Sequence, residues 1–317
     1  MSSKKKNIYI FLGKVILITL LIVFCIRTFV IEPYTLSSTQ MEAALVNGER
    51  ILIDKTAYGI RMPITILTIP FTFDKYSSII ELPYKRIFES SVKRNDIVLF
   101  NNPLDTLKPL DKRELVLSRC VALPGDSVHV KNGIFRINER DYVCSPDVMN
   151  EYFIKTPNKK NLTERINELE ISASSLREQL DTVFLRLNKL DAFILNKSLP
   201  DSMQLRTLID TVSNYKFLIP GKGKIIDLNT ETIAIYKQVI LIEKGSKAKI
   251  VDNKLYILGE EQRRYTFTDN YYWMLSDNTL ESSDSRALGF IPFRNIIGKG
   301  RFIWYSPIKG RSLSTIK

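Results

Sequence analysis

The apolar run from Ile8 to Ile31 constrains the fold of this chain more than any other stretch. As a helix it is long enough to cross about 30 Å of hydrocarbon, and its only exceptions are Gly13, Lys14, Thr19, Arg27 and Thr28. Lys14 and Arg27 lie near the ends of its most apolar portion, where long charged side chains can reach the membrane surface. A cleavable signal peptide would have a shorter apolar region and a small-residue cleavage site. The sequence therefore predicts a retained transmembrane anchor over residues 8–31, with membrane lipid as a partner.

The charges before this run predict its orientation. Lys4, Lys5 and Lys6 lie in a tail of residues 1–7, and the positive-inside rule places such a tail in the cytoplasm. No second run of comparable length follows. We therefore expect a single-pass membrane protein whose N-terminus is cytoplasmic and whose main domain, from residue 32 onward, is extracytoplasmic.

Charge and histidine content exclude several classes of protein. The chain has 46 lysines and arginines against 34 acidic residues, but the excess is spread along the sequence and accompanies no nucleic-acid-binding motif. We therefore expect no nucleic-acid partner. His129 is the only histidine, which excludes zinc sites with two or more histidines and means that any His-dependent triad must use it. We expect no metal and no cofactor.

The three cysteines leave two interpretations open. Cys25 lies in the apolar run, and neither C-x-x-C spacing nor the density of a disulfide scaffold is present. Cys120 and Cys144 are a candidate disulfide if their domain lies outside the cytosol. The alternative is two small buried thiols.

Short strand patterns separated by turns follow the apolar run. "ERILIDK" at 49–55 alternates apolar and polar residues, and "NDIVLF" at 95–100 is typical of a buried strand. Residues 126–140 carry two alternating runs around Asn132-Gly133, and residues 247–260 repeat this design around Asp252-Asn253. The sequence therefore predicts a mainly β, antiparallel domain built from residues 32–140 and 236–310.

Residues 141–235 interrupt this pattern with apolar residues spaced by seven. The seam consists of Leu162, Ile166, Leu169, Ala173, Leu176, Leu180, Val183, Leu187 and Leu190. Such a spacing without Pro or Gly is typical of a long helix with a coiled-coil seam. We therefore predict an insertion with a heptad helix near 162–190, which packs either on its own domain or on a partner.

Three separated blocks resemble the bacterial type I signal peptidases, also called leader peptidases. They are "EPYTLSSTQMEAALVNGERILIDK", "NDIVLFNNP" with "LSRCVALPGDSVHVKNG", and "YYWMLSDNTLESSDSRALGFIP" with "IIGKGRFIWYSP". The resemblance implies a β fold at the membrane of a bacterium, the inner (plasma) membrane, that cleaves signal peptides after small residues. It also implies a serine nucleophile and a lysine general base.

This chain departs from the family at both reactive positions. Counted without gaps from "EPY", Gln40 stands at the nucleophile position, and "LPGD" places Ser118 at the general-base position. A carboxamide has no proton suitable for nucleophilic attack, and a serine hydroxyl is too weak a base to replace a lysine. Ser38 matches the family's oxyanion-hole serine, a hydrogen-bond donor.

The third block keeps most supporting positions. By resemblance, Ser282 matches the serine that positions the lysine, and Asp284 and Arg286 match a structural ion pair. Asp277 and Asn278 match a turn, whereas Ser276 stands in place of the family's usual glycine. No residue is therefore expected to be an intact catalytic group, while the frame around the site is expected to persist.

Three functions remain open from the sequence. The favoured one is a catalytically inactive pseudoprotease that binds signal peptides or a secretion partner, such as an active signal peptidase or a translocation component. The alternatives are an active signal peptidase I with an unusual nucleophile, and a non-enzymatic membrane scaffold that acts through the heptad helix.

Overall fold

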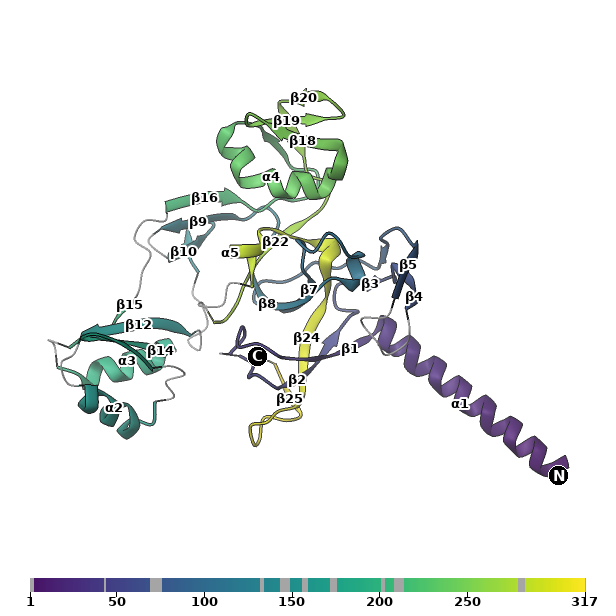
Figure 1. The fold of residues 1–317 in the computed structure, drawn as a ribbon, viewed down its shortest axis with the longest axis horizontal. Coiled ribbons are helices and arrows are strands. Elements are labelled where there is room, and N and C mark those ends of the chain that lie inside the picture. The colour runs from purple at the N-terminus through teal and green to yellow at the C-terminus, as the bar shows by residue number, and fades with distance from the viewer. Residues whose placement is uncertain are drawn as a thin grey trace.

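The computed structural model describes residues 3–42, 44–68, 76–131, 134–142, 149–155, 159–171, 176–200, 203–207, 214–278 and 283–316. The N-terminal helix α1 (Ser3–Phe29) projects from the remainder of the chain (Figure 1). Its segment Tyr9–Phe29 has 21 residues and a mean hydropathy of 2.7, and none of its most apolar window is buried. By length and composition, α1 can therefore cross a membrane.

An eight-stranded antiparallel sheet forms the centre of the fold. Its order is β1-β2-β24-β7-β8-β22-β23, and β25 also pairs with β24. These strands are β1 (Ile31–Thr35), β2 (Arg50–Asp54), β7 (Ile97–Asn101), β8 (Leu115–Ala122), β22 (Tyr271–Leu275), β23 (Ile291–Pro292), β24 (Ile296–Tyr305) and β25 (Ser314–Thr315). The prediction of a mainly β, antiparallel domain behind an apolar helix is confirmed.

Both faces of this sheet are buried, as β7 illustrates. Successive residues of a strand point to opposite faces. Ile97 and Leu99 pack in one apolar cluster with Leu36 and Met41. Val98 and Phe100 pack in a second cluster on the opposite face. Because "IVLFN" is apolar at four consecutive positions, it can fill both clusters at once.

Smaller sheets surround the central one. The sheet β11-β10-β9-β16 comprises β9 (Ser127–Lys131), β10 (Ile134–Ile137), β11 (Arg140–Asp141) and β16 (Asn214–Leu218). A meander of β18 (Ala248–Val251), β19 (Lys254–Ile257) and β20 (Glu260–Gln262) contacts helix α4 (Thr230–Lys244). The two-stranded pairs are β3 (Ile60–Arg61) with β6 (Arg86–Ile87), β4 (Thr65–Thr68) with β5 (Tyr76–Glu81), and β17 (Ile225–Asp227) with β21 (Arg264–Thr266). Short helical segments are η1 (Leu110–Lys112), η2 (Gly245–Lys247), α5 (Ser285–Leu288) and η3 (Phe293–Asn295).

Both predicted hairpins are present as antiparallel strand pairs, and the turn of one of them is described. Asp252 and Asn253 join β18 to β19 with φ of 49° and 56°, the left-handed conformation that Asn and Asp tolerate. β9 and β10 are antiparallel neighbours as expected, but Asn132 and Gly133 between them lie outside the described residues.

The prediction of one heptad helix over 162–190 is wrong. The described elements there are α2 (Lys159–Glu168), β13 (Leu176–Gln179), β14 (Thr182–Leu187) and α3 (Lys189–Ser198). With β12 (Asn150–Lys155) and β15 (Arg206–Thr207), they form a sheet of order β13-β14-β12-β15 and two ten-residue helices, at the left of Figure 1. The insertion is therefore not coiled-coil-like.

The physical reason lies in β14. Val183, Leu185 and Leu187 are buried while the residues between them are only partly buried, which is the two-residue period of a strand. Val183 and Leu187 also fit a seven-residue seam, so the two patterns coincide. Leu180, a seam position, is 88% exposed in the β13–β14 turn with φ of 54°.

The insertion sheet is confined to elements between residues 149 and 207. β16 pairs with β9 and thus belongs to another sheet. The expected boundary at residue 235 falls inside α4.

Candidate functional site

The site begins where the chain leaves β1, at the edge of the central sheet. The turn that carries Gln40 is held by Asn278, whose backbone N–H donates to the Gln40 carbonyl at 3.0 Å. The Asn278 side-chain amide donates to the Thr39 carbonyl at 3.2 Å. A residue next to β22 therefore fixes the backbone of the segment in which the family carries its nucleophile.

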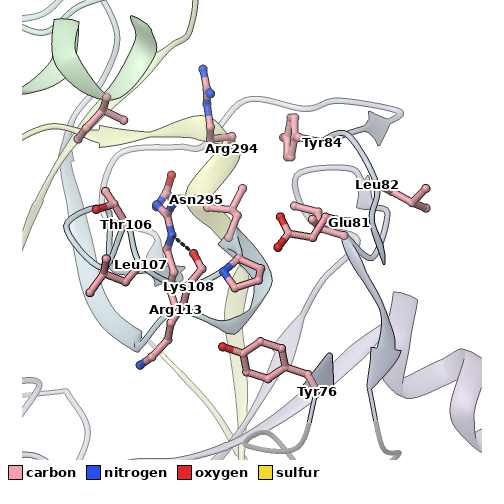
Figure 2. A pocket seen from close by; sticks show the side chains of 14 residues that line it. Tyr76, Glu81, Leu82, Tyr84, Thr106, Leu107, Lys108, Arg113, Arg294 and Asn295 are labelled. Atoms are coloured by element: carbon pink, nitrogen blue, oxygen red, sulfur yellow. Dashed lines mark hydrogen bonds between the residues drawn. The ribbon is translucent and has the colours of Figure 1, made fainter. Parts of the chain in front are cut away.

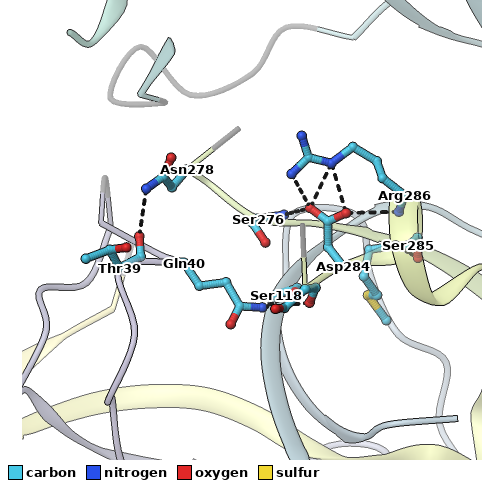
Figure 3. Close-up of polar contacts among 10 residues, drawn as sticks. Thr39, Gln40, Ser118, Ser276, Asn278, Asp284, Ser285 and Arg286 are labelled. Atoms are coloured by element: carbon cyan, nitrogen blue, oxygen red, sulfur yellow. Dashed lines mark hydrogen bonds and ion pairs between the residues drawn. The ribbon is translucent and has the colours of Figure 1, made fainter. Parts of the chain in front are cut away.

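The Gln40 carboxamide bridges two parts of the chain (Figure 3). Its Nε2 donates to the Ser118 hydroxyl at 3.3 Å and to the Ser283 carbonyl at 2.8 Å, and its Oε1 accepts from the Ser38 hydroxyl at 3.3 Å. Gln40 is 7% exposed and Ser118 is fully buried on β8. The amide thus uses both of its donors and its acceptor within the protein.

These contacts place three of the predicted site residues together. Gln40 and Ser118, the positions expected for nucleophile and base, are directly hydrogen-bonded, and Ser38 lies on the other side of the carboxamide. Within the described residues, no lysine or histidine forms a hydrogen bond with any of the three. Ser282 lies outside the described residues.

An ion pair between the buried Asp284 and the more exposed Arg286 supports the site from the segment after β22. Arg286 contacts Asp284 at 2.7 Å, and the Asp284 side chain is fully buried. The same carboxylate accepts from the backbone N–H groups of Arg286 at 2.9 Å and Ser276 at 2.8 Å. Asp284 therefore caps the N-terminus of α5 and ties it to the end of β22.

A second ion pair joins β8 to the turn at Asp277. Nε and Nη2 of Arg119 donate to the two carboxylate oxygens of Asp277 at 2.8 and 2.7 Å. This bidentate geometry fixes both distance and orientation. Because Arg119 follows Ser118 and Asn278 follows Asp277, the pair sets the spacing between the Ser118 strand and the Gln40 turn.

Sequence reasoning missed two of these contributors, Arg119 and the Ser283 carbonyl, and predicted Asn278 only as part of a turn. The partner of Arg119, Asp277, lies in a distant block of sequence. The Ser283 carbonyl and the Asn278 side chain act through contacts that no motif specifies.

Neither His129 nor Cys120, which the structure describes, forms a hydrogen bond with Gln40 or Ser118. His129 Nε2 contacts the Asn214 side chain at 3.0 Å in the β9–β16 pair. Cys120 is a free, fully buried thiol, so it is not in a disulfide, and Cys144 lies outside the described residues. Burial, together with the Asp96 carboxylate, raises the pKa of Cys120 and keeps the thiol protonated. No group of three or more His, Cys, Asp or Glu in the described residues is placed to hold a metal ion.

Comparison with known proteins identifies the family. A family model described as "Signal peptidase, peptidase S26" matches residues 9–305. The chain is 28% identical over 290 residues to "Signal peptidase I" of Buchnera aphidicola subsp. Baizongia pistaciae (strain Bp), covering 92% of this chain and 74% of that protein. It is 29% identical over 289 residues to "Signal peptidase I" of Buchnera aphidicola subsp. Schizaphis graminum (strain Sg), with 91% and 72% covered. It is also 23% identical over 290 residues to "Signal peptidase I" of Rickettsia typhi, with 90% and 76% covered. The chain therefore belongs to the signal peptidase family, peptidase S26.

Proposed function

We propose that this protein is a catalytically inactive member of the signal peptidase family that binds signal peptides at the membrane without cleaving them. The observation that carries the proposal is the hydrogen bond from Gln40 Nε2 to the Ser118 hydroxyl. An amide nitrogen faces a serine at the place where the family resemblance implies a serine hydroxyl and a lysine amine. The Gln40 amide cannot act as nucleophile or base, and the Ser118 hydroxyl has no basic group bonded to it in the described residues that could activate it.

Open strand edges beside Gln40 support retained peptide binding. In the described residues, β1 pairs only with β2, and the first half of β8 pairs only with β7, because β22 pairs with β8 at Arg119–Ala122. The two free edges flank the Gln40–Ser118 contact. An extended peptide can add to such edges through main-chain hydrogen bonds, which do not require a reactive side chain.

Ser276 offers a further polar contact for a peptide. Its hydroxyl is buried and has no hydrogen-bond partner in the described part of the chain, although its backbone N–H is bonded to Asp284. A buried hydroxyl without a partner is costly. A peptide carbonyl would satisfy this donor once the residues that cover the hydroxyl move aside.

The alternative is an active peptidase that uses Ser38 as its nucleophile. Ser38 donates to Gln40 Oε1, and the carboxamide oxygen is too weak a base to activate it. We therefore expect Ser38 to remain a hydrogen-bond donor.

For the anchor, we propose a cytoplasmic N-terminus and an extracytoplasmic main domain, on the basis of Lys4, Lys5 and Lys6.

The test is a cleavage assay with a purified signal-peptide substrate and the full chain in detergent. We expect no cleavage above background by the wild type, because losing the nucleophile and base of a serine protease costs roughly a million-fold in rate. Gln40→Ser alone should remain inactive since the new hydroxyl lacks a base. Cleavage is expected to appear only in Gln40→Ser/Ser118→Lys, and the matched control Gln40→Ala/Ser118→Lys should stay inactive.

Two outcomes would contradict the proposal in different ways. Wild-type cleavage that is abolished by Ser38→Ala would establish the relocated nucleophile. Fluorescence anisotropy of a labelled signal peptide measures binding independently. If the wild type neither cleaves nor binds the peptide, the inactivity stands and the peptide-binding function is wrong.

A further inference from the structure

A pocket away from Gln40 lies between the β4–β5 hairpin and the loop that leads into η1 (Figure 2). Its volume is about 480 Å³. Tyr76, Glu81 and Leu82 line one wall, and Leu107 and Arg113 line the wall opposite. The pocket therefore has walls of mixed charge and apolar character, and none of its lining residues takes part in the site described above.

Arg113 is the cation in this pocket that lacks a carboxylate partner. Its Nε donates to the Lys108 carbonyl at 3.2 Å, and it forms no ion pair in the described residues. The other two cationic side chains of the lining are paired, Arg294 with Asp269 at 2.9 Å and Lys108 with Asp105 at 3.1 Å. Figure 2 shows the Arg294 side chain extending away from the pocket. An anion in the pocket would therefore meet Arg113 first.

The surroundings of Arg113 carry further positive charge. Burial is the main cause that lowers the pKa of Arg113, and Arg294 acts in the same direction while Asp105 opposes it. Partial burial, followed by repulsion from Arg86, lowers the pKa of Arg61 to about 10. Positively charged guanidinium groups that lie near one another repel, and an anion bound beside them offsets this repulsion.

The pocket lies close to the end of the membrane-spanning helix. Lys55 Nζ donates to the carbonyl of Arg27 in the last turn of α1 at 3.1 Å, and Arg61 is near enough to lower the pKa of Lys55. The Nζ of Lys112, in η1, lies 5.7 Å from the ring centroid of Tyr76. Glu32, just after α1, is near enough to raise the pKa of Lys112, although burial has the larger effect and lowers it. Figure 1 shows β4 and β5 next to this end of α1.

Apolar side chains line the rim of the pocket. Leu107 is 98% exposed and Leu82 is 44% exposed, and both belong to the lining. Exposed leucines beside a partly buried cation suit a ligand with an anionic head and an apolar tail. Free phosphate shares the head but would leave the leucines exposed to water.

We propose that this pocket binds the phosphodiester headgroup of a membrane phospholipid, with Arg113 as the anion ligand and Leu82 and Leu107 along the apolar part of the lipid. The inference does not depend on whether Gln40 and Ser118 support catalysis. Glu81 lies across the pocket from Arg113, and its carboxylate opposes an anionic ligand (Figure 2).

The test is native mass spectrometry of the full chain in a mild detergent, titrated with dioctanoyl phosphatidylglycerol. Arg113→Gln should weaken lipid binding about tenfold or more, the range expected for one hydrogen bond to a charged group. Glu81→Gln should strengthen binding because it removes a repelling charge. Arg136→Gln, a change at an exposed arginine on β10, should leave binding unchanged.

Two further arms separate the sources of the anion and guard against misfolding. Glycerol 3-phosphate at the same concentrations should bind far more weakly than the lipid, and equal binding would overturn a lipid site in favour of free phosphate. Leu107→Ser alters a fully exposed side chain and so should not unfold the protein. It should weaken lipid binding but not glycerol phosphate binding. Lipid binding that survives both Arg113→Gln and Leu107→Ser would exclude the pocket.

Discussion

Two polar clusters meet at the candidate site, and they differ in charge and in the tightness of their contacts. The neutral cluster, Gln40 with Ser38 and Ser118, has two hydrogen bonds of 3.3 Å within it. The charged cluster, Asp284 with Arg286 and Asp277 with Arg119, has ion pairs of 2.7 Å and accepts additional backbone N–H groups. The contacts among Ser38, Gln40 and Ser118 are thus longer than the ion pairs around them, although Gln40 also donates to the Ser283 carbonyl at 2.8 Å.

The ion pairs that support the site are present in this chain, although Gln40 and Ser118 stand at the positions of nucleophile and base. A buried carboxylate must keep its partners, because an uncompensated charge in the interior is expensive. A buried amide or hydroxyl that loses a partner costs less. The charged cluster should therefore determine the stability of the site, and the neutral cluster should tolerate substitution.

The largest expected effect follows from breaking the charged cluster. Asp284→Ala removes the cap of α5 and the acceptor of the buried Ser276 N–H, and it leaves Arg286 without its carboxylate, so we expect a loss of about 2–4 kcal/mol in the free energy of unfolding. Denaturant unfolding of the detergent-solubilised protein measures it. The control, Asp227→Ala, removes a solvent-exposed ion pair with Arg264 and should cost less than about 1 kcal/mol. Equal losses from Asp284→Ala and Asp227→Ala would show that the charged cluster contributes no more to stability than a solvent-exposed ion pair.

A smaller effect is expected from the neutral cluster. Gln40→Met keeps a similar volume but removes the carboxamide, which leaves the buried Ser118 hydroxyl without its partner. We expect a loss of about 1–3 kcal/mol in the same unfolding measurement. Gln179→Met, at an exposed position of β13, should change stability by less than about 0.5 kcal/mol. A loss for Gln40→Met as large as that for Asp284→Ala would show that the neutral cluster is equally important.

The sequence predicted the β domain well because its strand and turn patterns each favour one local structure. The buried run of β7 and the Asp252-Asn253 turn each favour a single local structure, and motif order then places Gln40 and Ser118 on neighbouring segments. Which nitrogen contacts which oxygen was not predictable. The bond from Gln40 to the Ser283 carbonyl depends on a backbone path that side-chain identities do not specify.

The insertion was mispredicted because its apolar spacing satisfies two periods. Leu162 and Ile166 are buried on a helix, as a seven-residue seam requires, but the chain then turns to strands. Within β14 the same kind of apolar residue recurs every second position. A β-branched and aromatic segment such as "TVFLRL" favours a strand when it finds partners, and β12 and β13 supply them.

The smallest expected effect concerns two buried serines, Ser118 of the neutral cluster and Ser285, which lies between Asp284 and Arg286 in the sequence. Ser118 accepts one hydrogen bond of 3.3 Å from Gln40, so Ser118→Ala removes only this long contact, and the Gln40 Nε2 keeps its shorter bond to the Ser283 carbonyl at 2.8 Å while one of its N–H groups loses its acceptor. Ser285 instead accepts from the Met274 backbone N–H at 2.9 Å, and Ser285→Ala would leave that buried donor without this partner. We therefore expect Ser118→Ala to cost about 0.5–1 kcal/mol and Ser285→Ala about 1–3 kcal/mol, although both serines are almost completely buried. Because the two changes remove the same atom, their difference in unfolding free energy measures the hydrogen-bonding environment rather than lost volume. A larger loss for Ser118→Ala than for Ser285→Ala would mean that the hydrogen bond at the reactive positions contributes more to stability than the bond from Met274 to Ser285.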